Sequence, residues 1–202
     1  MKIPHLLQIG AAAMLMTACS HAPLAPGAFV AYAMDKDNGL VQTRDFDDLA
    51  LRLRYRPVEE LVLQELGTEA PSDSIQHAIV ARKGAHHFNL QLKALKVKDL
   101  LNARSPDPDD YFRKQYYFGS LVDADLLLVI GADTLPCALA HFERTYGAAP
   151  FNELVVSFID DSPEPYRDDL HFIYNDRAFG LGPVEFVIRK EDLQQLPSLK
   201  LS

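Results

Sequence analysis

The segment Leu49–Tyr55, "LALRLRY", decides the fold because apolar and polar residues alternate along it. On an extended chain, Leu49, Leu51, Leu53 and Tyr55 lie on one face, and two arginines lie on the other. A period of two is typical of a β-strand with one buried face and one solvated face. We therefore predict a strand here, with its leucines in a core.

Five more segments have strand-like patterns. "FNLQLKA", from Phe88, and "VEFVIR", from Val184, alternate in the same way. "DLLLVI", from Asp125, and "ELVVSFI", from Glu153, are denser apolar runs that are typical of central strands. "DLHFIYND", residues 169–176, is the fifth. The chain is therefore rich in strands.

One longer helix is expected in "SPDPDDYFRKQYYF". Asp107 can cap its first turn, Pro108 fits the first helical position, and Phe112 and Tyr116 share one face. We predict a helix that begins at this cap.

Shorter helices are expected in "KVKDLLNA", from Lys96, and in "KEDLQQL", residues 190–196. "CALAHFERTY", from Cys137, fits either a helix or a strand, and Asp37–Gly39 supplies residues suited to a tight hairpin turn. The predicted fold class is mainly β, a β-sandwich-like architecture with two or three short helices. An α+β fold is the alternative.

The first 18 residues have the parts of a secretory signal peptide. Lys2 and His5 make a short polar start, 6–16 is an apolar run, and small residues precede Cys19. The run is shorter than the roughly 20 apolar residues that a transmembrane helix needs. We expect it to be removed rather than retained.

Met16-Thr17-Ala18-Cys19 resembles the lipobox of bacterial lipoproteins, except that the pattern prefers leucine where Met16 stands. The resemblance implies lipidation of Cys19, which becomes the new N-terminus, and attachment to a membrane through acyl chains. Ser20 stands where an inner-membrane signal often has Asp, so the outer membrane is favoured over the inner. The alternatives are an ordinary cleaved signal peptide and a cytosolic start.

These features predict three segments: a signal peptide in 1–18, a lipidated Cys19 with a proline-rich tether in 19–27, and a single β-rich domain in 28–202. The eight residues 20–27 could reach roughly 25 Å at about 3.1 Å per residue. Two segments, "YRPVEELVLQEL" from Tyr55 and "DTLPCALAHFERTYG" from Asp133, are similar to segments of uncharacterised bacterial lipoproteins. That similarity implies export and brings no function.

The charge of the chain limits its partners. The sequence has 20 basic and 28 acidic residues, and removal of 1–18 takes away only Lys2, which leaves 19 against 28 and a net charge of −9. An acidic chain is not expected to bind nucleic acid, whose affinity comes mostly from cationic contacts to phosphate. A basic protein partner is compatible with it.

Cys19 and Cys137 are the only cysteines of the chain. If Cys19 carries lipid, Cys137 has no disulfide partner within the chain. Because its neighbours are apolar, we interpret Cys137 as a small buried hydrophobic residue rather than a nucleophile.

Common catalytic motifs are missing: the sequence has no nucleophile elbow, no phosphate-binding glycine loop, no CxxC and no HExxH. Two pairs of residues are weak candidates, because His141 with Glu143 and Asp169 with His171 are each two positions apart and share a strand face. If the pairs converged in a cleft, they could form an acid–base couple or a metal site. Separate polar contacts on solvated faces are the simpler interpretation.

The segment "DDSPEPYRDD", from Asp160, is a weak candidate for a metal site. Asp160, Asp161, Glu164 and Asp168 could hold Ca²⁺, although a solvated loop between two strands has the same composition. No other cofactor is expected. His86 and His87 are neighbours that would point to opposite faces of a strand, so a shared metal is not expected there.

Two alternative functions are compatible with these features of the sequence. The first is a noncatalytic, membrane-anchored lipoprotein that binds another cell-envelope protein or has a structural role; immunity to a basic toxin is one version. It predicts a wide surface patch with exposed aromatic residues from Tyr111, Tyr116 or Tyr117. The alternative is an envelope hydrolase or metal-dependent enzyme that uses the two histidine–carboxylate pairs.

Overall fold

The structure, a computed structural model, describes residues 22–105, 107–146 and 148–201. This part of the chain contains nine strands, five α-helices and two short 3₁₀ helices. The strands are β1 (Val41–Asp45), β2 (Leu49–Arg56), β3 (Ala85–Ala94), β4 (Leu126–Ile130), β5 (Asp133–Pro136), β6 (Leu139–Glu143), β7 (Asn152–Ile159), β8 (Leu170–Asp176) and β9 (Gly182–Ile188). The helices are α1 (Pro26–Met34), α2 (Val58–Leu66), α3 (Ser72–Ala81), α4 (Pro108–Ser120), α5 (Lys190–Gln194), η1 (Leu100–Asn102) and η2 (Val122–Asp125).

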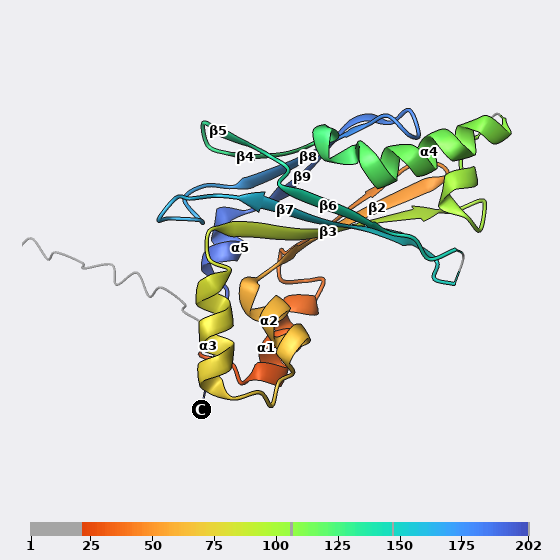
Figure 1. Ribbon diagram of the computed structural model, residues 1–202. Coiled ribbons are helices and arrows are strands. Elements are labelled where there is room, and N and C mark those ends of the chain that lie inside the picture. Colours follow the sequence, from red (N-terminus) through yellow and green to blue (C-terminus); the bar gives the residue numbers. More distant parts are fainter. Residues whose placement is uncertain (1–21, 106, 147, 202) are drawn as a thin grey trace, which may run out of the picture.

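The strands form two antiparallel sheets that face each other as a sandwich (Figure 1). One sheet has the strand order β1-β2-β3-β7-β6, and the other has the order β5-β4-β8-β9. The predicted class, mainly β and sandwich-like, is confirmed. All six predicted strands are present, and "CALAHFERTY", which the pattern left open, contains the strand β6.

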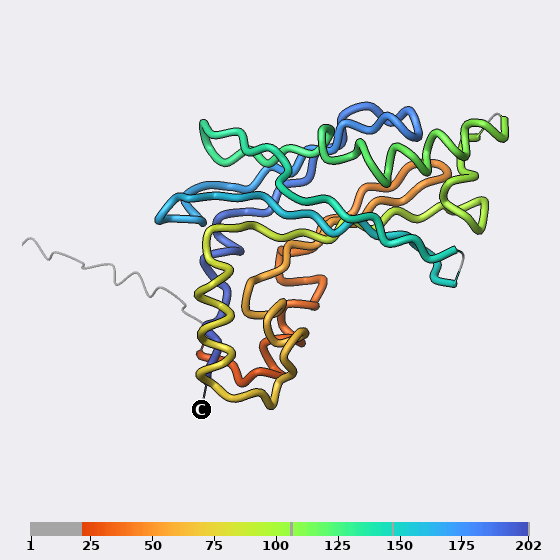
Figure 2. Tube along the Cα trace, in the orientation of Figure 1, coloured from red at the N-terminus to blue at the C-terminus, as the bar shows by residue number. Residues whose placement is uncertain are grey.

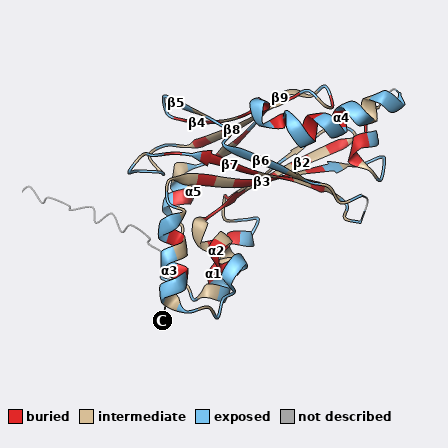
Figure 3. Ribbon diagram, viewed as in Figure 1, coloured by how far each residue is buried: buried red, intermediate tan, exposed pale blue. Residues whose placement is uncertain are grey.

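The alternation in β2 places its apolar residues in the core. Leu49, Leu51, Leu53 and Tyr55 are buried, and β3 lies beside them in antiparallel register. Figure 3 shows the buried positions recurring along the strands of both sheets. The two-residue period of the sequence therefore sets which face of the sheet is covered.

Aromatic rings join the two sheets. The Phe172 ring on β8 lies 5.1 Å from the Phe88 ring on β3 and 5.8 Å from the Phe158 ring on β7, measured between centroids. The second of these pairs meets edge to face, an arrangement that aromatic rings favour. Full burial of one such side chain contributes roughly 1.5–3 kcal/mol, so these rings supply much of the stability of the sandwich.

Helices α1, α2 and α3 form a second hydrophobic cluster at one end of the sandwich (Figures 1 and 2). The buried residues of this cluster are Phe29, Ala33, Val62, Leu63, Ile75 and Ile79. The prediction of two or three short helices was therefore too low. Prolines immediately before α2 and α3 start these helices, which are so short that their apolar periodicity is weak in the sequence.

The last residues of the predicted tether segment, 19–27, belong to the folded part. Leu24 forms a parallel bridge with Leu199, and α1 begins at Pro26, a residue that suits the first turn of a helix. The folded part therefore begins before the predicted boundary at residue 28. Cys19 and the predicted signal peptide lie outside the described residues.

The turn predicted at Asp37–Gly39 does not close a β-hairpin, because it leads from α1 into β1. The Asn38 side chain holds this turn: it donates to the backbone oxygen of Tyr32 at 2.5 Å and accepts from the backbone N of Leu40 at 3.0 Å. Gly39 has a φ of +81°, and a Cβ there would lie only 2.1 Å from an Asp192 oxygen. Glycine is needed for both conformation and space.

Candidate functional site

The first histidine–carboxylate pair lies on the outer face of the five-stranded sheet. His141 and Glu143 are exposed on β6. Phe142, between them, faces the core and stacks on Phe118 of α4 with 4.7 Å between ring centroids. Strand alternation therefore turns both polar side chains away from the core.

The second pair belongs to the four-stranded sheet. His171 on β8 lies 2.7 Å from a carboxylate oxygen of Glu185, and Asp169 accepts from the backbone N of Lys190 at 2.8 Å. Their neighbours Leu170 and Phe172 are buried, so His171 also faces outward. The structure does not bring the two pairs together. The catalytic hypothesis required that they converge in one cleft, and they do not.

The acidic loop does not gather its carboxylates around one point. Asp160 is buried and contacts Arg167 at 2.7 Å and His86 at 3.2 Å. Burial opposes its ionisation, but hydrogen bonds from Arg167, the backbone N of Ser162 and His86 outweigh burial and lower the pKa of its carboxyl.

The other three acidic candidates lie differently. Asp161 and Glu164 are exposed, and Asp168 is exposed and accepts from the backbone N of Asp169. Within the described ranges, no three histidine, cysteine or acidic residues are grouped so that they could hold a metal ion. The calcium hypothesis therefore has no geometric support in this loop, whose buried carboxylate is paired with a cation instead.

His86 and His87 point to opposite faces of β3, as predicted. His86 contacts Asp160 inside the molecule, whereas Nδ1 of His87 lies 2.8 Å from the hydroxyl of Ser157. Burial, together with the nearby charges of His86, Arg56 and Arg82, lowers the pKa of His87 to about 4. His87 is therefore neutral at pH 7.

Cys137 is half-buried, and its Sγ lies 3.9 Å from the backbone oxygen of Ser157. Burial raises the pKa of the thiol to about 11. The thiol is therefore protonated at neutral pH, which agrees with a packing role rather than a nucleophilic one.

A set of exposed aromatic residues gathers on α4 and beside the end of β6. Phe112 and Tyr116, one helical turn apart on α4, are 65% and 62% exposed, and Tyr146 is 77% exposed. We call Phe112, Tyr116 and Tyr146, with Arg144 and the half-buried Tyr111, the aromatic surface. Large aromatic side chains in water are unfavourable unless something covers them.

Arg144 links the two parts of the aromatic surface. Its guanidinium carbon lies 4.2 Å from the Tyr146 ring centroid and 5.2 Å from the Tyr111 ring centroid, so the cation contacts two rings. The same guanidinium donates to Asp99 at 3.2 Å and to the hydroxyl of Tyr111. These contacts hold the rings of Tyr111 and Tyr146 in one arrangement before anything binds.

The backbone at Tyr146 is strained. Its φ is +51°, a left-handed conformation that is rare for a bulky residue and costs about 1–3 kcal/mol. The preceding residue, Thr145, is held by a hydrogen bond from its backbone N to Asn152 at 3.0 Å and from its hydroxyl to the backbone oxygen of Phe151 at 3.0 Å. The surrounding structure thus keeps Tyr146 exposed at a cost.

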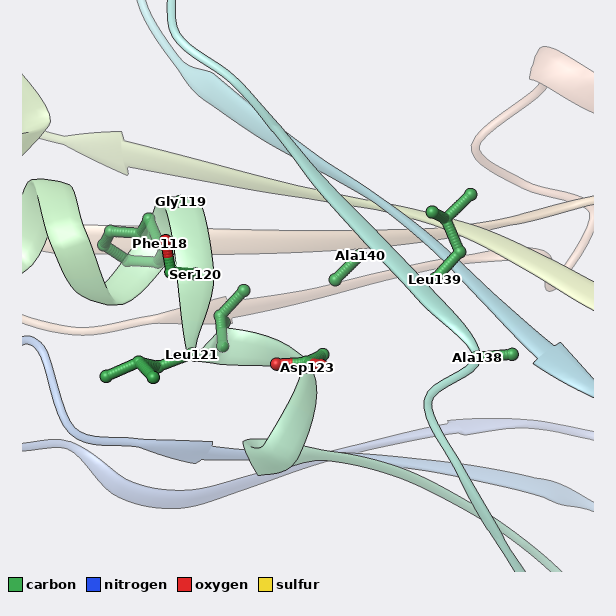
Figure 4. Close-up of a pocket in the computed structure, with 9 residues that line it drawn as sticks. Phe118, Gly119, Ser120, Leu121, Asp123, Ala138, Leu139 and Ala140 are labelled. Carbon is green, nitrogen blue, oxygen red and sulfur yellow. The ribbon is translucent and has the colours of Figure 1, made fainter.

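A hollow of about 230 Å³ lies where the end of α4 meets β6 (Figure 4). Gly119 and Ser120, which continue the helical face of Phe112 and Tyr116, form one wall. The exposed side chains of Leu121 and Leu139 add apolar surface. The hollow has room for a side chain of a binding partner.

The prediction from the sequence identified only part of the aromatic surface. Of the three predicted tyrosines, Tyr116 is exposed, Tyr111 is half-buried under Arg144, and Tyr117 is only 8% exposed because it lies on the helical face that packs on the sandwich. Arg144 and Tyr146 were missed. In the sequence, a tyrosine two positions after an arginine predicts neither the exposure of the ring nor its contact with the arginine.

The fold and the site define a β-sandwich protein with added helices and an exposed aromatic surface. No protein-family model matches the sequence, and no curated protein matches it significantly. Among solved structures, it is similar to a DUF4426 family protein from Pseudomonas aeruginosa PAO1, with 14% identity over 73% of this chain and 90% of that one, at a TM-score of 0.35. It is also similar to a protein of unknown function from Burkholderia pseudomallei K96243, with 12% identity over 85% and 87% of the two chains, at a TM-score of 0.39. Neither similarity assigns a function.

Proposed function

We propose that this chain is a noncatalytic lipoprotein of the bacterial cell envelope, anchored by lipid on Cys19, and that its aromatic surface binds another envelope protein. The observation that carries the binding role is the exposure of Phe112, Tyr116 and Tyr146 around the preordered Arg144. Tyrosine and arginine are enriched among the residues that dominate protein–protein binding energies. Rigid aromatic side chains also lose little conformational entropy on binding.

Charge identifies the kind of partner. Asp109 and Asp123 are exposed beside the aromatic surface and its hollow, whereas Asp107 is paired with Arg113 at 3.5 Å. The proposed mature chain has a net charge of −9, from 19 basic and 28 acidic residues. Complementary charges at the rim of an interface speed association and select the partner. The proposed partner therefore has an apolar centre and a basic rim.

The proposed anchor rests on the sequence Met16–Cys19 and on the apolar run before it. Among the described helices, none has the length and apolar character needed to span a bilayer. Two or more acyl chains on Cys19 would hold the domain at a membrane without such a helix. Ser20 favours the outer membrane.

Site-specific photo-crosslinking in intact cells tests the binding role. A crosslinking amino acid at Tyr116 or at Tyr146 is expected to capture the same basic protein. The same probe at Val80, an exposed apolar residue on α3, is the matched control and is expected not to capture it. Phe112→Ala should reduce the yield at Tyr116 about tenfold or more, as expected for a residue that dominates binding.

Two results would contradict the binding role: no adduct shared by the two aromatic positions, or an equal adduct at Val80. Because Phe112 is exposed, Phe112→Ala should leave the melting temperature unchanged, which separates lost binding from lost folding. The adduct yield should also fall as salt is raised, since the proposed rim contacts are exposed charges.

The anchor has its own test. Intact-mass measurement of the mature protein should find a chain that begins at Cys19 and carries acyl groups. Cys19→Ser should release the protein from membranes, whereas Cys137→Ser should leave it membrane-bound; these are the two cysteines of the chain. An unprocessed or unacylated chain would refute the anchor and leave the binding role to be judged separately.

A further inference from the structure

A cavity of about 420 Å³ lies between the helical cluster and the sandwich, away from the aromatic surface. It is lined by the end of β2, by α2 and α3, by the turn before β3 and by the loop 162–166. Small-molecule sites in proteins are commonly about 300–1,000 Å³ and lie between packed units. The size and place of this cavity therefore suit a small ligand.

The walls of the cavity are mainly apolar. Val58 and Ile79 line it from the helices, and Pro163 and Pro165 line it from the loop. Aliphatic and proline side chains offer contact area but no hydrogen bonds. They would hold the apolar part of a ligand by burial.

Two tyrosines supply a hydrogen-bonding group within the cavity. The hydroxyl of Tyr55 donates to the hydroxyl oxygen of Tyr166 at 3.2 Å, and the two rings meet edge to face. Burial raises the pKa of both phenols, so both stay protonated. The proton of Tyr166 has no acceptor among the described residues and remains available to a ligand.

Two opposite charges complete the lining. Lys83 and Glu59 both line the cavity, and within the described ranges neither forms an ion pair or a hydrogen bond through its side chain. The cavity thus offers an ammonium and a phenol as donors and a carboxylate as an acceptor. One ligand that satisfies all three carries a carboxylate and an ammonium group beside an apolar body.

The loop that carries Tyr166 is held in place. Asp160, at its start, accepts from Arg167 at 2.7 Å, and the backbone N of Asp160 donates to the oxygen of Gly84 at 2.8 Å. Gly84 has a φ of +89°, which glycine adopts without strain. The cavity is therefore formed before a ligand binds, which lowers the entropic cost of binding.

We infer that this cavity binds a free α-amino acid with an apolar side chain. Its carboxylate would meet Lys83 and Tyr166, its ammonium would meet Glu59, and its side chain would lie against Val58, Ile79 and the two prolines. This inference is independent of the lipid anchor and of the aromatic surface.

Isothermal titration of the mature, membrane-extracted protein with L-phenylalanine and L-leucine tests the inference. Binding of at least one of them is expected. Lys83→Met, Glu59→Gln and Tyr166→Phe should each weaken binding about tenfold or more, because each removes a proposed partner of a charged ligand group. Lys93→Met and Glu69→Gln change exposed residues outside the cavity, so they are the matched controls and should bind as the natural chain does.

Ligand analogues identify the partner of each charge. N-acetyl-L-phenylalanine lacks the ammonium, so it should bind the natural chain more weakly than L-phenylalanine does. Its affinity for the Glu59→Gln variant should equal its affinity for the natural chain. L-phenylalaninamide lacks the carboxylate, so its affinity for the Lys83→Met variant should equal its affinity for the natural chain. Binding of neither amino acid at millimolar concentration would overturn the inference, and so would equal binding of decanoate, which has a carboxylate and an apolar chain but no ammonium.

Discussion

The sandwich and the helical cluster are held together by different means. In the sandwich, the rings of Phe88, Phe158 and Phe172 meet across the two sheets and are fully buried. The helical cluster has one buried aromatic residue, Phe29, among small and aliphatic neighbours. A cluster of six buried residues is too small to be stable by itself, so it depends on contacts with its neighbours.

That help comes from a buried polar network on the outer face of the five-stranded sheet. Glu60 of α2 is fully buried and accepts from Arg54 at 2.8 Å and from Arg56 at 3.2 Å, both on β2. The side chain of Gln64 also donates to Glu60 at 2.9 Å. Apolar burial therefore holds the sandwich together, whereas ionic contacts fix the helices to it.

Removing a ring from the sandwich should have the largest effect. Phe172→Ala deletes a fully buried ring that contacts both sheets and should lower the free energy of unfolding by about 3–5 kcal/mol. Urea denaturation followed by circular dichroism measures this loss. Tyr116→Ala, at an exposed ring, is the control and should change it by less than about 0.5 kcal/mol. Equal losses in the two variants would contradict the account of the core.

Breaking the polar network should have a smaller, local effect. Glu60→Gln keeps the size of the side chain but leaves two arginines without their carboxylate, which should cost about 2–3 kcal/mol. Hydrogen exchange should accelerate in α2 and α3 and change much less in β8. Glu69→Gln, at an exposed position, is the matched control. Uniform acceleration through both regions would mean that they unfold as one unit.

Acid should lower the stability of the fold through His87 on β3, with the smallest effect of the three. Because the pKa of His87 is about 4 in the folded protein and about 6.5 when unfolded, protons favour the unfolded chain as pH falls through this range. These two pKa values correspond to a loss of about 2 kcal/mol in stability between pH 7 and pH 5 from this residue.

His87→Gln isolates this contribution, since Gln can keep a hydrogen bond to Ser157 but does not titrate in this range. The difference in unfolding free energy between pH 7 and pH 5 should be smaller in this variant than in the natural chain. An identical difference in both would show that other groups carry the pH dependence.

The sequence predicted the sandwich well because its strands alternate or are continuously apolar. Leu49–Tyr55 needs no tertiary information to indicate a strand with one buried face. Short elements were missed: β1 is polar and lies at a sheet edge, β5 has four residues, and α2 has nine. Local pattern is weak over such lengths, and packing decides these elements.

The candidate sites were harder to predict because they depend on which faces meet. The spacing of His141 and Glu143 correctly placed both side chains on one strand face, but spacing cannot tell which sheet a strand joins. The cavity at Tyr166 combines residues that are more than 100 positions apart, since Tyr55 and Tyr166 differ by 111. No linear motif encodes such a pairing.

The bridge between Leu24 and Leu199 limits how far the domain can stand from its proposed attachment point. Leu24 is the fifth residue after Cys19, and five residue steps span at most about 18 Å when fully extended. If Cys19 carries lipid, so short a connection would restrict rotation of the domain relative to the membrane. With lipid on Cys19, the helical end would stay close to the headgroups, and any partner of the aromatic surface would have to approach within a narrow layer above the bilayer.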